Sequence, residues 1–169
     1  MAKIMFKGQP VNTAGQLPAV GCMAPAFRLT NAELQDVGLE QLGAKRKILN
    51  IVPSLDTPVC AASARRFHEA VSDMADVALV NISADLPFAQ QRFCASEGLQ
   101  NIVSLSTMRA PDFGRDYGVA MLDGPLAGLM SRAVLVLDAG NRVLYVEQVP
   151  EIAQEPDYAA ALAALQATA

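Results

Sequence analysis

Residues 53–60, with the sequence Pro-Ser-Leu-Asp-Thr-Pro-Val-Cys, separate a strand-like run from a helical one. The preceding residues 47–52 form an apolar run of the length of a buried strand. In residues 61–71 the apolar side chains recur with helical spacing instead. We therefore expect a strand over 47–52, a turn that begins at the proline, and a helix over 58–71.

The turn places one cysteine in the first turn of this helix. Thr57 suits the N-cap position and Pro58 the first helical position, so Cys60 is the third residue of the helix. The partial positive charge of a helix N-terminus stabilises a thiolate. The pattern predicts a reactive thiol at Cys60. The alternative is a small buried cysteine that happens to lie near a helix end.

Composition is typical of a domain that needs no cross-links. The chain has 169 residues, enough for one domain with a substantial core, and we expect residues 1–169 to form a single domain. It has three cysteines, widely spaced and without a Cys-x-x-Cys pair. An odd and sparse set of this kind argues against a secreted disulfide scaffold and favours a reducing compartment.

Charge and hydropathy exclude several classes of partner. The net charge of −4 provides no basic field for nucleic acid, and we expect the one tight basic cluster, residues 45–47, to lie in solvent at a strand entrance. The first seven residues hold too few apolar side chains for a signal peptide, and no apolar run is long enough to cross a membrane. We expect a cytoplasmic protein that binds neither nucleic acid nor membranes.

The elements predicted on either side of this turn alternate between strands and helices. We expect strands at 3–6, 11–13, 27–29, 77–82, 102–105, 132–137 and 142–148, and helical segments at 39–42, 88–97, 111–117 and from 156 to the C-terminal end. The first two strands form an N-terminal β-hairpin, and residues 138–141 form the turn of a later one. A β-α-β-α-β order followed by a hairpin and a terminal helix is that of a thioredoxin-like α/β fold. In such a sheet Cys60 lies at the carboxyl end of a central strand, where ligands bind.

A second cysteine lies on the next predicted helix. Cys94 falls within 88–97, so only the tertiary fold could bring it to Cys60. If the two pair, each sulfur starts on its own helix, and oxidation requires local unwinding. The other interpretation is that Cys94 is a core residue beside Phe93. The residues alone leave both open.

Three stretches together resemble the bacterial thiol peroxidase subfamily of the peroxiredoxins. The first contains Pro53, Thr57 and Cys60 in the pattern Pro-x-x-x-Thr-x-x-Cys. The others are Ile-Ser-Ala-Asp-Leu-Pro-Phe-Ala-Gln-Gln-Arg-Phe-Cys at 82–94 and Ala-Met-Leu-Asp-Gly-Pro-Leu-Ala-Gly-Leu at 120–129. The resemblance also covers the N-terminal hairpin and residues 155–158, and so nearly the whole chain.

The resemblance implies an activity and a set of partners. It implies an atypical two-cysteine peroxiredoxin in which Cys60 attacks the hydroperoxide and Cys94 resolves the product as an intramolecular disulfide, which thioredoxin reduces. It implies a homodimer, a preference for alkyl hydroperoxides over hydrogen peroxide, and no cofactor. A peroxide sensor that oxidises a partner protein would use the same residues, and remains the alternative function.

Three further residues receive roles through the resemblance. Arg132 matches the arginine that lies beside the peroxidatic sulfur in this family, Thr57 supplies a hydroxyl to the peroxide, and Pro53 shields the pocket. From the residues alone, an ordinary exposed charge at a strand end is the favoured interpretation of Arg132. Pro58 departs from the family pattern and should stiffen the first turn. Cys22 matches no family role, and we expect it to be partly buried.

Other cysteine chemistries fit less well. A cysteine hydrolase needs a base, but the single histidine, His68, lies eight residues after Cys60, about 12 Å along the same helix. A zinc site formed by Cys22, Cys60, Cys94 and His68 has suitable ligand types but no paired local spacing. A thioredoxin-type carrier would require Cys-x-x-Cys, and position 57 is threonine.

Overall fold

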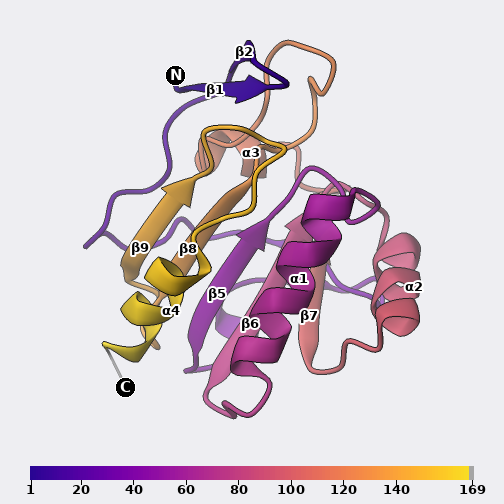
Figure 1. Ribbon diagram of the computed structural model, residues 1–169. Helices are drawn as coiled ribbons and strands as arrows, with labels where there is room; N and C mark the ends of the chain where they lie inside the picture. The colour runs from indigo at the N-terminus through magenta and orange to yellow at the C-terminus, as the bar shows by residue number, and fades with distance from the viewer. Residues whose placement is uncertain (168–169) are drawn as a thin grey trace.

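The protein has a large mixed sheet and a separate N-terminal hairpin (Figure 1). The computed structural model describes residues 1–167. Within them the strands are β1 Lys3–Phe6, β2 Gln9–Asn12, β3 Leu29–Thr30, β4 Asp36–Val37, β5 Arg46–Ile51, β6 Val77–Ser83, β7 Ile102–Ser106, β8 Ala133–Leu137 and β9 Val143–Gln148. The helices are α1 Pro58–Val71, α2 Pro87–Glu97, α3 Phe113–Asp116 and α4 Tyr158–Gln166, with a 3-10 turn, η1, at Glu40–Leu42.

Strand β5 lies inside the large sheet and leads directly to the turn. The strand order is β4-β3-β7-β6-β5-β8-β9, with β5 parallel to β6 and antiparallel to β8. Because β8 runs against β5, the first residue of β8, Ala133, pairs with the last residue of β5, Ile51. The residues just before β8 and just after β5 therefore meet at the same edge of the sheet.

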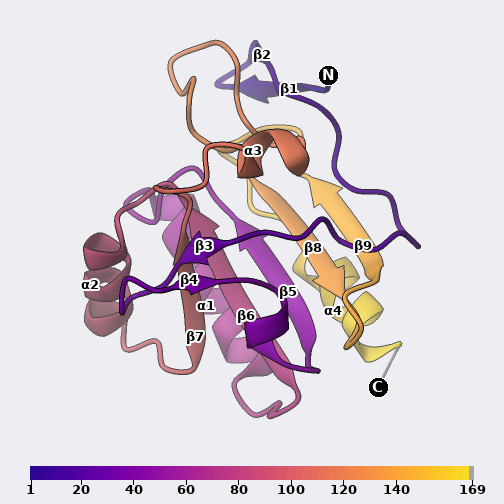
Figure 2. The ribbon, with the colours of Figure 1, turned by 180° about the vertical axis from the view of Figure 1, so that it is seen from behind.

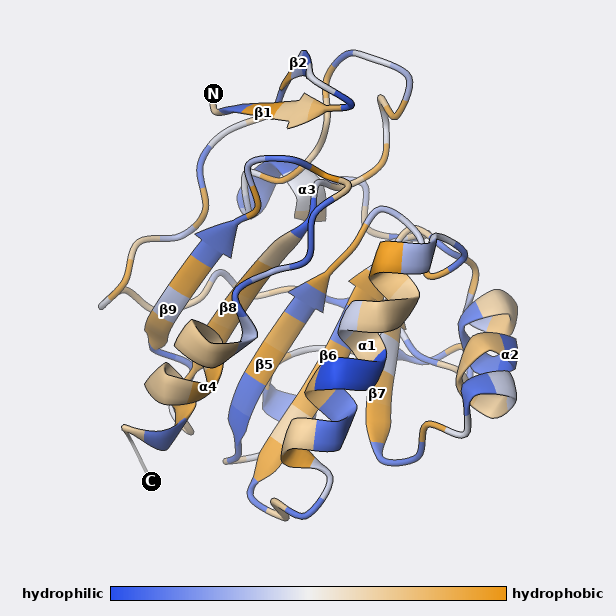
Figure 3. Cartoon of the chain, in the orientation of Figure 1, coloured by the Kyte–Doolittle hydropathy of each residue, from blue (hydrophilic) through white to orange (hydrophobic). Residues whose placement is uncertain are grey.

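Helices and loops cover the two faces of the sheet. Helices α1 and α4 lie on the face toward the viewer in Figure 1, with α2 beside β7 at the side of the molecule. Figure 2 shows α3, η1 and the β3–β4 segment on the opposite face. Strands β6 and β8 are buried along their whole length and are hydrophobic over most of it (Figure 3). Strands covered on both faces are expected to have this composition.

The period of two along β5 divides its side chains between two apolar clusters. Leu49 and Ile51 pack with Phe27, Phe113 and Tyr117 on the α3 side. On the other side Ile48 packs with side chains of α1 and α4. Neighbouring side chains of a strand point to opposite faces, so one short strand anchors both layers and fixes where α1 begins.

The sequence predicted this architecture, with differences in detail. The thioredoxin-like α/β order and the N-terminal hairpin are confirmed. Strand β4 was missed, because a two-residue strand carries no periodic signal. The helix predicted over 111–117 is only the four-residue α3. The expectation of one domain over 1–169 stays a prediction, and residues 168–169 lie outside the described part of the chain.

The basic cluster at the start of β5 was expected in solvent, and this is wrong for Lys47. Its side chain is fully buried, and Nζ donates to the carbonyl oxygens of Gly43 at 3.0 Å and Lys45 at 2.7 Å. Burial lowers the pKa of the Lys47 ammonium. Two backbone acceptors compensate part of the cost of burying this charge.

Candidate active site

The first turn of α1 carries a fully buried cysteine. Thr57 occupies the N-cap with an extended backbone, and Pro58 is the first helical residue. Cys60 is the third, with no exposed surface. It packs in an apolar cluster with Val52, Leu55, Ala64 and Phe93. As at the start of any helix, the N–H groups of this turn have no carbonyl one turn earlier to bond, so they are available to an acceptor at the site.

A buried arginine contacts this sulfur. Arg132 is 2% exposed, and its Nη1 lies 3.2 Å from Cys60 Sγ. Its Nε donates to the Ile152 carbonyl oxygen at 2.9 Å, which fixes the plane of the guanidinium. The sheet explains the approach, since Arg132 directly precedes β8 and Cys60 follows β5 at the same edge. The alternative of an exposed strand-end charge does not fit.

Positive charge lies close to the Cys60 sulfur. No ion pair between Arg132 and a carboxylate occurs within residues 1–167. A buried charge without a counter-charge is costly, and the side-chain group that this guanidinium reaches is the Cys60 sulfur at 3.2 Å. The Arg132 guanidinium and the N-terminus of α1 therefore both present positive charge to the Cys60 sulfur.

Thr57 lies above the helix but bonds differently from a simple cap. Its hydroxyl donates to the Ser54 carbonyl oxygen at 3.0 Å, and its side chain accepts no helix N–H. The expectation that this hydroxyl donates to a peroxide therefore conflicts with its use in the reduced protein, because its only proton is already engaged. Pro53 is buried at the start of the same loop.

Cys94 lies on α2 and shares the apolar cluster of Cys60, together with Leu99 and Phe93. It is half-buried, and its Sγ lies 3.4 Å from Ser104 Oγ on β7. All three cysteines are free thiols. The fold thus brings both helices to one cluster, while the two sulfurs contact different residues, Arg132 for Cys60 and Ser104 for Cys94.

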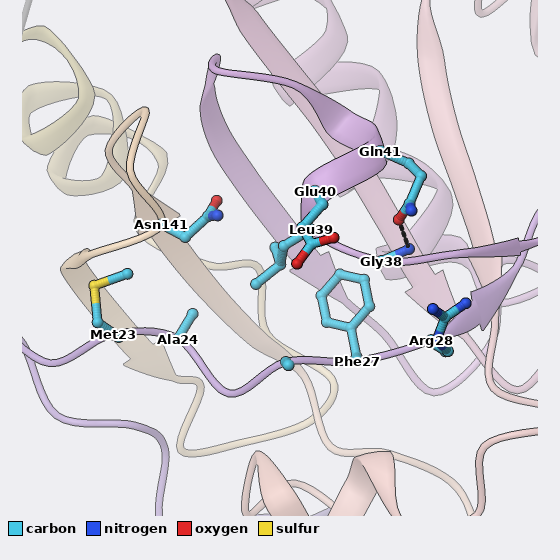
Figure 4. Close-up of a pocket in the computed structure, with 10 residues that line it drawn as sticks. Met23, Ala24, Phe27, Arg28, Gly38, Leu39, Glu40, Gln41 and Asn141 are labelled. Carbon is cyan, nitrogen blue, oxygen red and sulfur yellow. Dashed lines mark hydrogen bonds between the residues drawn. The ribbon is translucent and has the colours of Figure 1, made fainter.

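Two hollows differ in what surrounds them. One, of about 290 Å³, lies between the start of α1 and α2 and is lined by Leu55, Thr57, Pro58 and Phe93 among others. Another, of about 400 Å³, is lined by residues that include Phe27, Leu39 and Asn141 (Figure 4). The second contains none of the residues predicted for the site. Of these two hollows, only the first lies beside the turn that carries Cys60.

The rival chemistries find no matching geometry. His68 is half-buried on α1, and its Nε2 lies 2.8 Å from the Gln100 carbonyl oxygen. Cys22 was expected to be partly buried but is exposed. Throughout residues 1–167 no group of three or more histidine, cysteine, aspartate or glutamate side chains could hold a metal ion. In the same range no helix is long and apolar enough to span a bilayer.

A polar group beside the site was not predicted. Asp85, in the loop after β6, accepts hydrogen bonds from Ser54, Leu55 and Ser83, and Gln90 of α2 bonds Ser83. The only signal available was position: β5 and β6 are parallel, so the loops after them lie at one edge. An aspartate in such a loop is too common to mark a site.

Comparisons of sequence and of structure match most of this chain to the same group of proteins. A family model described as Redoxin matches residues 19–162. A thiol peroxidase of Mycobacterium tuberculosis is 52% identical over 167 residues, which are 99% of this chain and all of that one. The structure of a peroxiredoxin-like protein from Aquifex aeolicus covers 100% of this chain and 98% of its own, with a TM-score of 0.92 and 35% identity. The structure of the thiol peroxidase from Chromobacterium violaceum has a TM-score of 0.91 and 28% sequence identity. It covers 98% of this chain and 95% of its own.

Proposed function

The chain belongs to the Redoxin family and is a thiol peroxidase of the peroxiredoxin type, and we propose that Cys60 attacks the hydroperoxide and that Cys94 resolves the product. The observation that carries the assignment is the 3.2 Å contact between the buried Arg132 guanidinium and Cys60 Sγ. Neither Cys94 nor Cys22 has a cationic partner of this kind among the hydrogen bonds of residues 1–167.

In the first step the Cys60 thiolate attacks the terminal oxygen of the hydroperoxide. The S–O bond forms while the O–O bond breaks, and the leaving alkoxide or hydroxide takes up a proton to give an alcohol or water. Negative charge moves from sulfur to oxygen in this step. The fixed Arg132 guanidinium and the N–H groups of Val59 and Cys60 stabilise that charge at both positions.

Thr57 orients the peroxide as an acceptor. Its hydroxyl proton is held by the Ser54 carbonyl oxygen, so its lone pairs remain for the O–H of the incoming hydroperoxide. Pro53, buried at the base of the same loop, keeps water away from the sulfur. These two residues position and shield, while Cys60 and Arg132 carry the charge.

In the second step the Cys94 thiol attacks the Cys60 sulfenic acid. The S–S bond forms, the sulfenic hydroxyl leaves, and together with the thiol proton it becomes water. An external dithiol then reduces the disulfide by two exchanges and is itself oxidised. We assign this reductant as thioredoxin, and we propose that the protein works as a homodimer in the cytoplasm.

Peroxide turnover by cysteine variants tests the assignment. With thioredoxin, its reductase, NADPH and tert-butyl hydroperoxide, Cys60→Ser should show no turnover, and Cys94→Ser should consume one equivalent and stop. Cys22→Ser, which changes the exposed third cysteine, is the matched control and should keep full activity. Turnover by Cys60→Ser would contradict the proposal. Turnover with a small dithiol but not with thioredoxin would contradict only the reductant.

A further inference from the structure

One carboxylate fixes the loop that precedes the Cys60 helix. Asp85 Oδ1 accepts from Ser54 Oγ at 2.7 Å, and Oδ2 accepts from the Leu55 N–H at 2.8 Å. Ser54 in turn supplies the carbonyl oxygen to which Thr57 donates, and its Oγ accepts the Asp56 N–H at 3.2 Å. Hydrogen bonds to an ionised acceptor are about twice as strong as neutral ones. Asp85 therefore holds Thr57 in place through Ser54.

The same carboxylate is linked to the helix that carries Cys94. Ser83 Oγ donates to Asp85 Oδ2 at 2.7 Å and accepts from Gln90 Nε2 at 3.0 Å. Gln90 is 1% exposed, also donates to the Leu105 carbonyl oxygen, and lies one turn before Cys94 on α2. A continuous chain of hydrogen bonds thus joins the segment before Cys60 to the helix of Cys94.

These bonds belong to the reduced arrangement. A disulfide requires a sulfur–sulfur distance of about 2.05 Å, whereas Cys60 Sγ lies against Arg132 and Cys94 Sγ against Ser104. Bringing the sulfurs together requires the first turn of α1, the end of α2, or both to leave these positions. Movement of the first turn strains or breaks the bonds of Asp85 to Ser54 and Leu55.

We propose that Asp85 is a positioning residue that acts in opposite directions on the two chemical steps, an inference that rests on the proposed function. By fixing Ser54 and Thr57 it preorganises the first turn of α1 and speeds attack on the peroxide. By holding the same turn, and through Ser83 the helix α2, it slows formation of the Cys60–Cys94 disulfide. A residue needed only for folding would not separate the two steps in this way.

The test measures both steps in one experiment. Reduced protein is mixed with tert-butyl hydroperoxide, quenched in acid at intervals, and analysed by intact mass after trapping of sulfenic acid and free thiols. Asp85→Ala should form sulfenic acid about tenfold more slowly, the size expected for one charge-assisted hydrogen bond. It should then form the disulfide several-fold faster than the unaltered protein. Asp85→Asn keeps one acceptor oxygen, so both of its rates should lie between those of Asp85→Ala and those of the unaltered protein.

Two further variants separate the hydrogen bonds to the loop before Cys60 from those to helix α2. Gln90→Leu removes the link to α2 but leaves Ser54 bound, so only disulfide formation should be faster. Ser54→Ala removes one bond of the loop and replaces Asp85→Ala if that variant does not fold. The matched control is Asp138→Ala, a carboxylate that accepts two backbone N–H groups in the β8–β9 turn, at the end of the sheet where β5 begins. It should change neither rate.

The outcomes are distinguishable. Equal changes in both steps, no change, or the same result with Asp138→Ala would overturn the inference and leave the proposed function intact. If the unaltered protein forms no Cys60–Cys94 disulfide, the proposed function fails, and the inference fails with it.

Discussion

The two segments that carry the candidate catalytic cysteines are held very differently. Cys60 is fully buried, and its sulfur contacts a guanidinium that is itself anchored to a carbonyl oxygen. Cys94 is half-buried, and its sulfur contacts one serine hydroxyl at 3.4 Å. Charge and burial are concentrated at the residue assigned to peroxide attack, where a preorganised site accelerates the reaction.

The helices repeat this contrast. Helix α1 buries Cys60, Ser63, Ala64, Phe67 and Val71, which follow one face along its whole length. Helix α2 buries only Pro87, Gln90 and Phe93, whereas its N-cap Leu86 is 53% exposed and Phe88 in its first turn is 63% exposed. Segments with few buried contacts open at the lowest free-energy cost. We infer that α2 moves more readily than α1 during resolution.

The largest effect should come from the arginine of the rigid segment. Arg132→Lys keeps the charge but loses the planar fork that bonds Cys60 Sγ and the Ile152 carbonyl oxygen together. The rate of Cys60 oxidation by tert-butyl hydroperoxide should fall by about 100-fold, as for loss of one fixed donor. Rapid-quench mass spectrometry measures it directly.

Arg46→Lys is the matched control for this substitution, since Arg46 bonds Asp76 and a backbone carbonyl far along the sheet from Cys60. It should oxidise at the unaltered rate. If Arg132→Lys also oxidises within threefold of that rate, the guanidinium is not part of the reaction, and the contrast between the two segments loses its main support.

A smaller effect should come from the proline at the start of α1. Pro58→Gly frees the first helical position, which proline restricts to one range of φ. If opening of the turn around Cys60 contributes to resolution, the disulfide should form about three- to tenfold faster, with sulfenic acid formation nearly unchanged. Pro111→Gly, an exposed proline before α3, controls for the general effect of glycine. An unchanged rate of disulfide formation would show that α1 need not open.

The smallest effect should come from the surface contact between the two helices. Arg65 Nη1 on α1 lies 2.7 Å from Glu97 Oε2 on α2, but both side chains are partly exposed. Such pairs contribute less than about 1 kcal/mol and weaken with salt. Arg65→Gln should change disulfide formation less than about fivefold, with the difference vanishing in 1 M salt.

Arg115→Gln, which breaks the exposed ion pairs of Arg115 with Asp112 and Asp116 at α3, is the control for the Arg65 substitution. A change of tenfold or more with Arg65→Gln, persisting in high salt, would mean that this contact, rather than the packing of the helices, governs their separation.

The sequence revealed the rigid segment better than its surroundings. The strand, the turn and the first helical residues are local features, so Thr57, Pro58 and Cys60 could be placed from spacing alone. Arg132 was identified only by resemblance, because its approach to Cys60 depends on the antiparallel pairing of β8 with β5.

What could not be predicted depends on side-chain geometry across the sheet. The bond of Thr57 to Ser54, the burial of Lys47 and the acceptor role of Asp85 all require knowing which loops adjoin and how each side chain is turned. Their residue types are common in turns and at strand ends, and no periodic pattern marks them.

Disulfide mapping shows whether Cys60 reacts with the hydroperoxide and then pairs with Cys94. Reduced protein is treated with one equivalent of tert-butyl hydroperoxide, free thiols are blocked, and peptides are mapped by mass spectrometry beside a Cys94→Ser control. We expect a Cys60–Cys94 link within one chain, replaced in the control by Cys60 sulfenic acid or its more oxidised forms. An unreactive Cys60, or one joined instead to Cys22 or to a second chain, would contradict it.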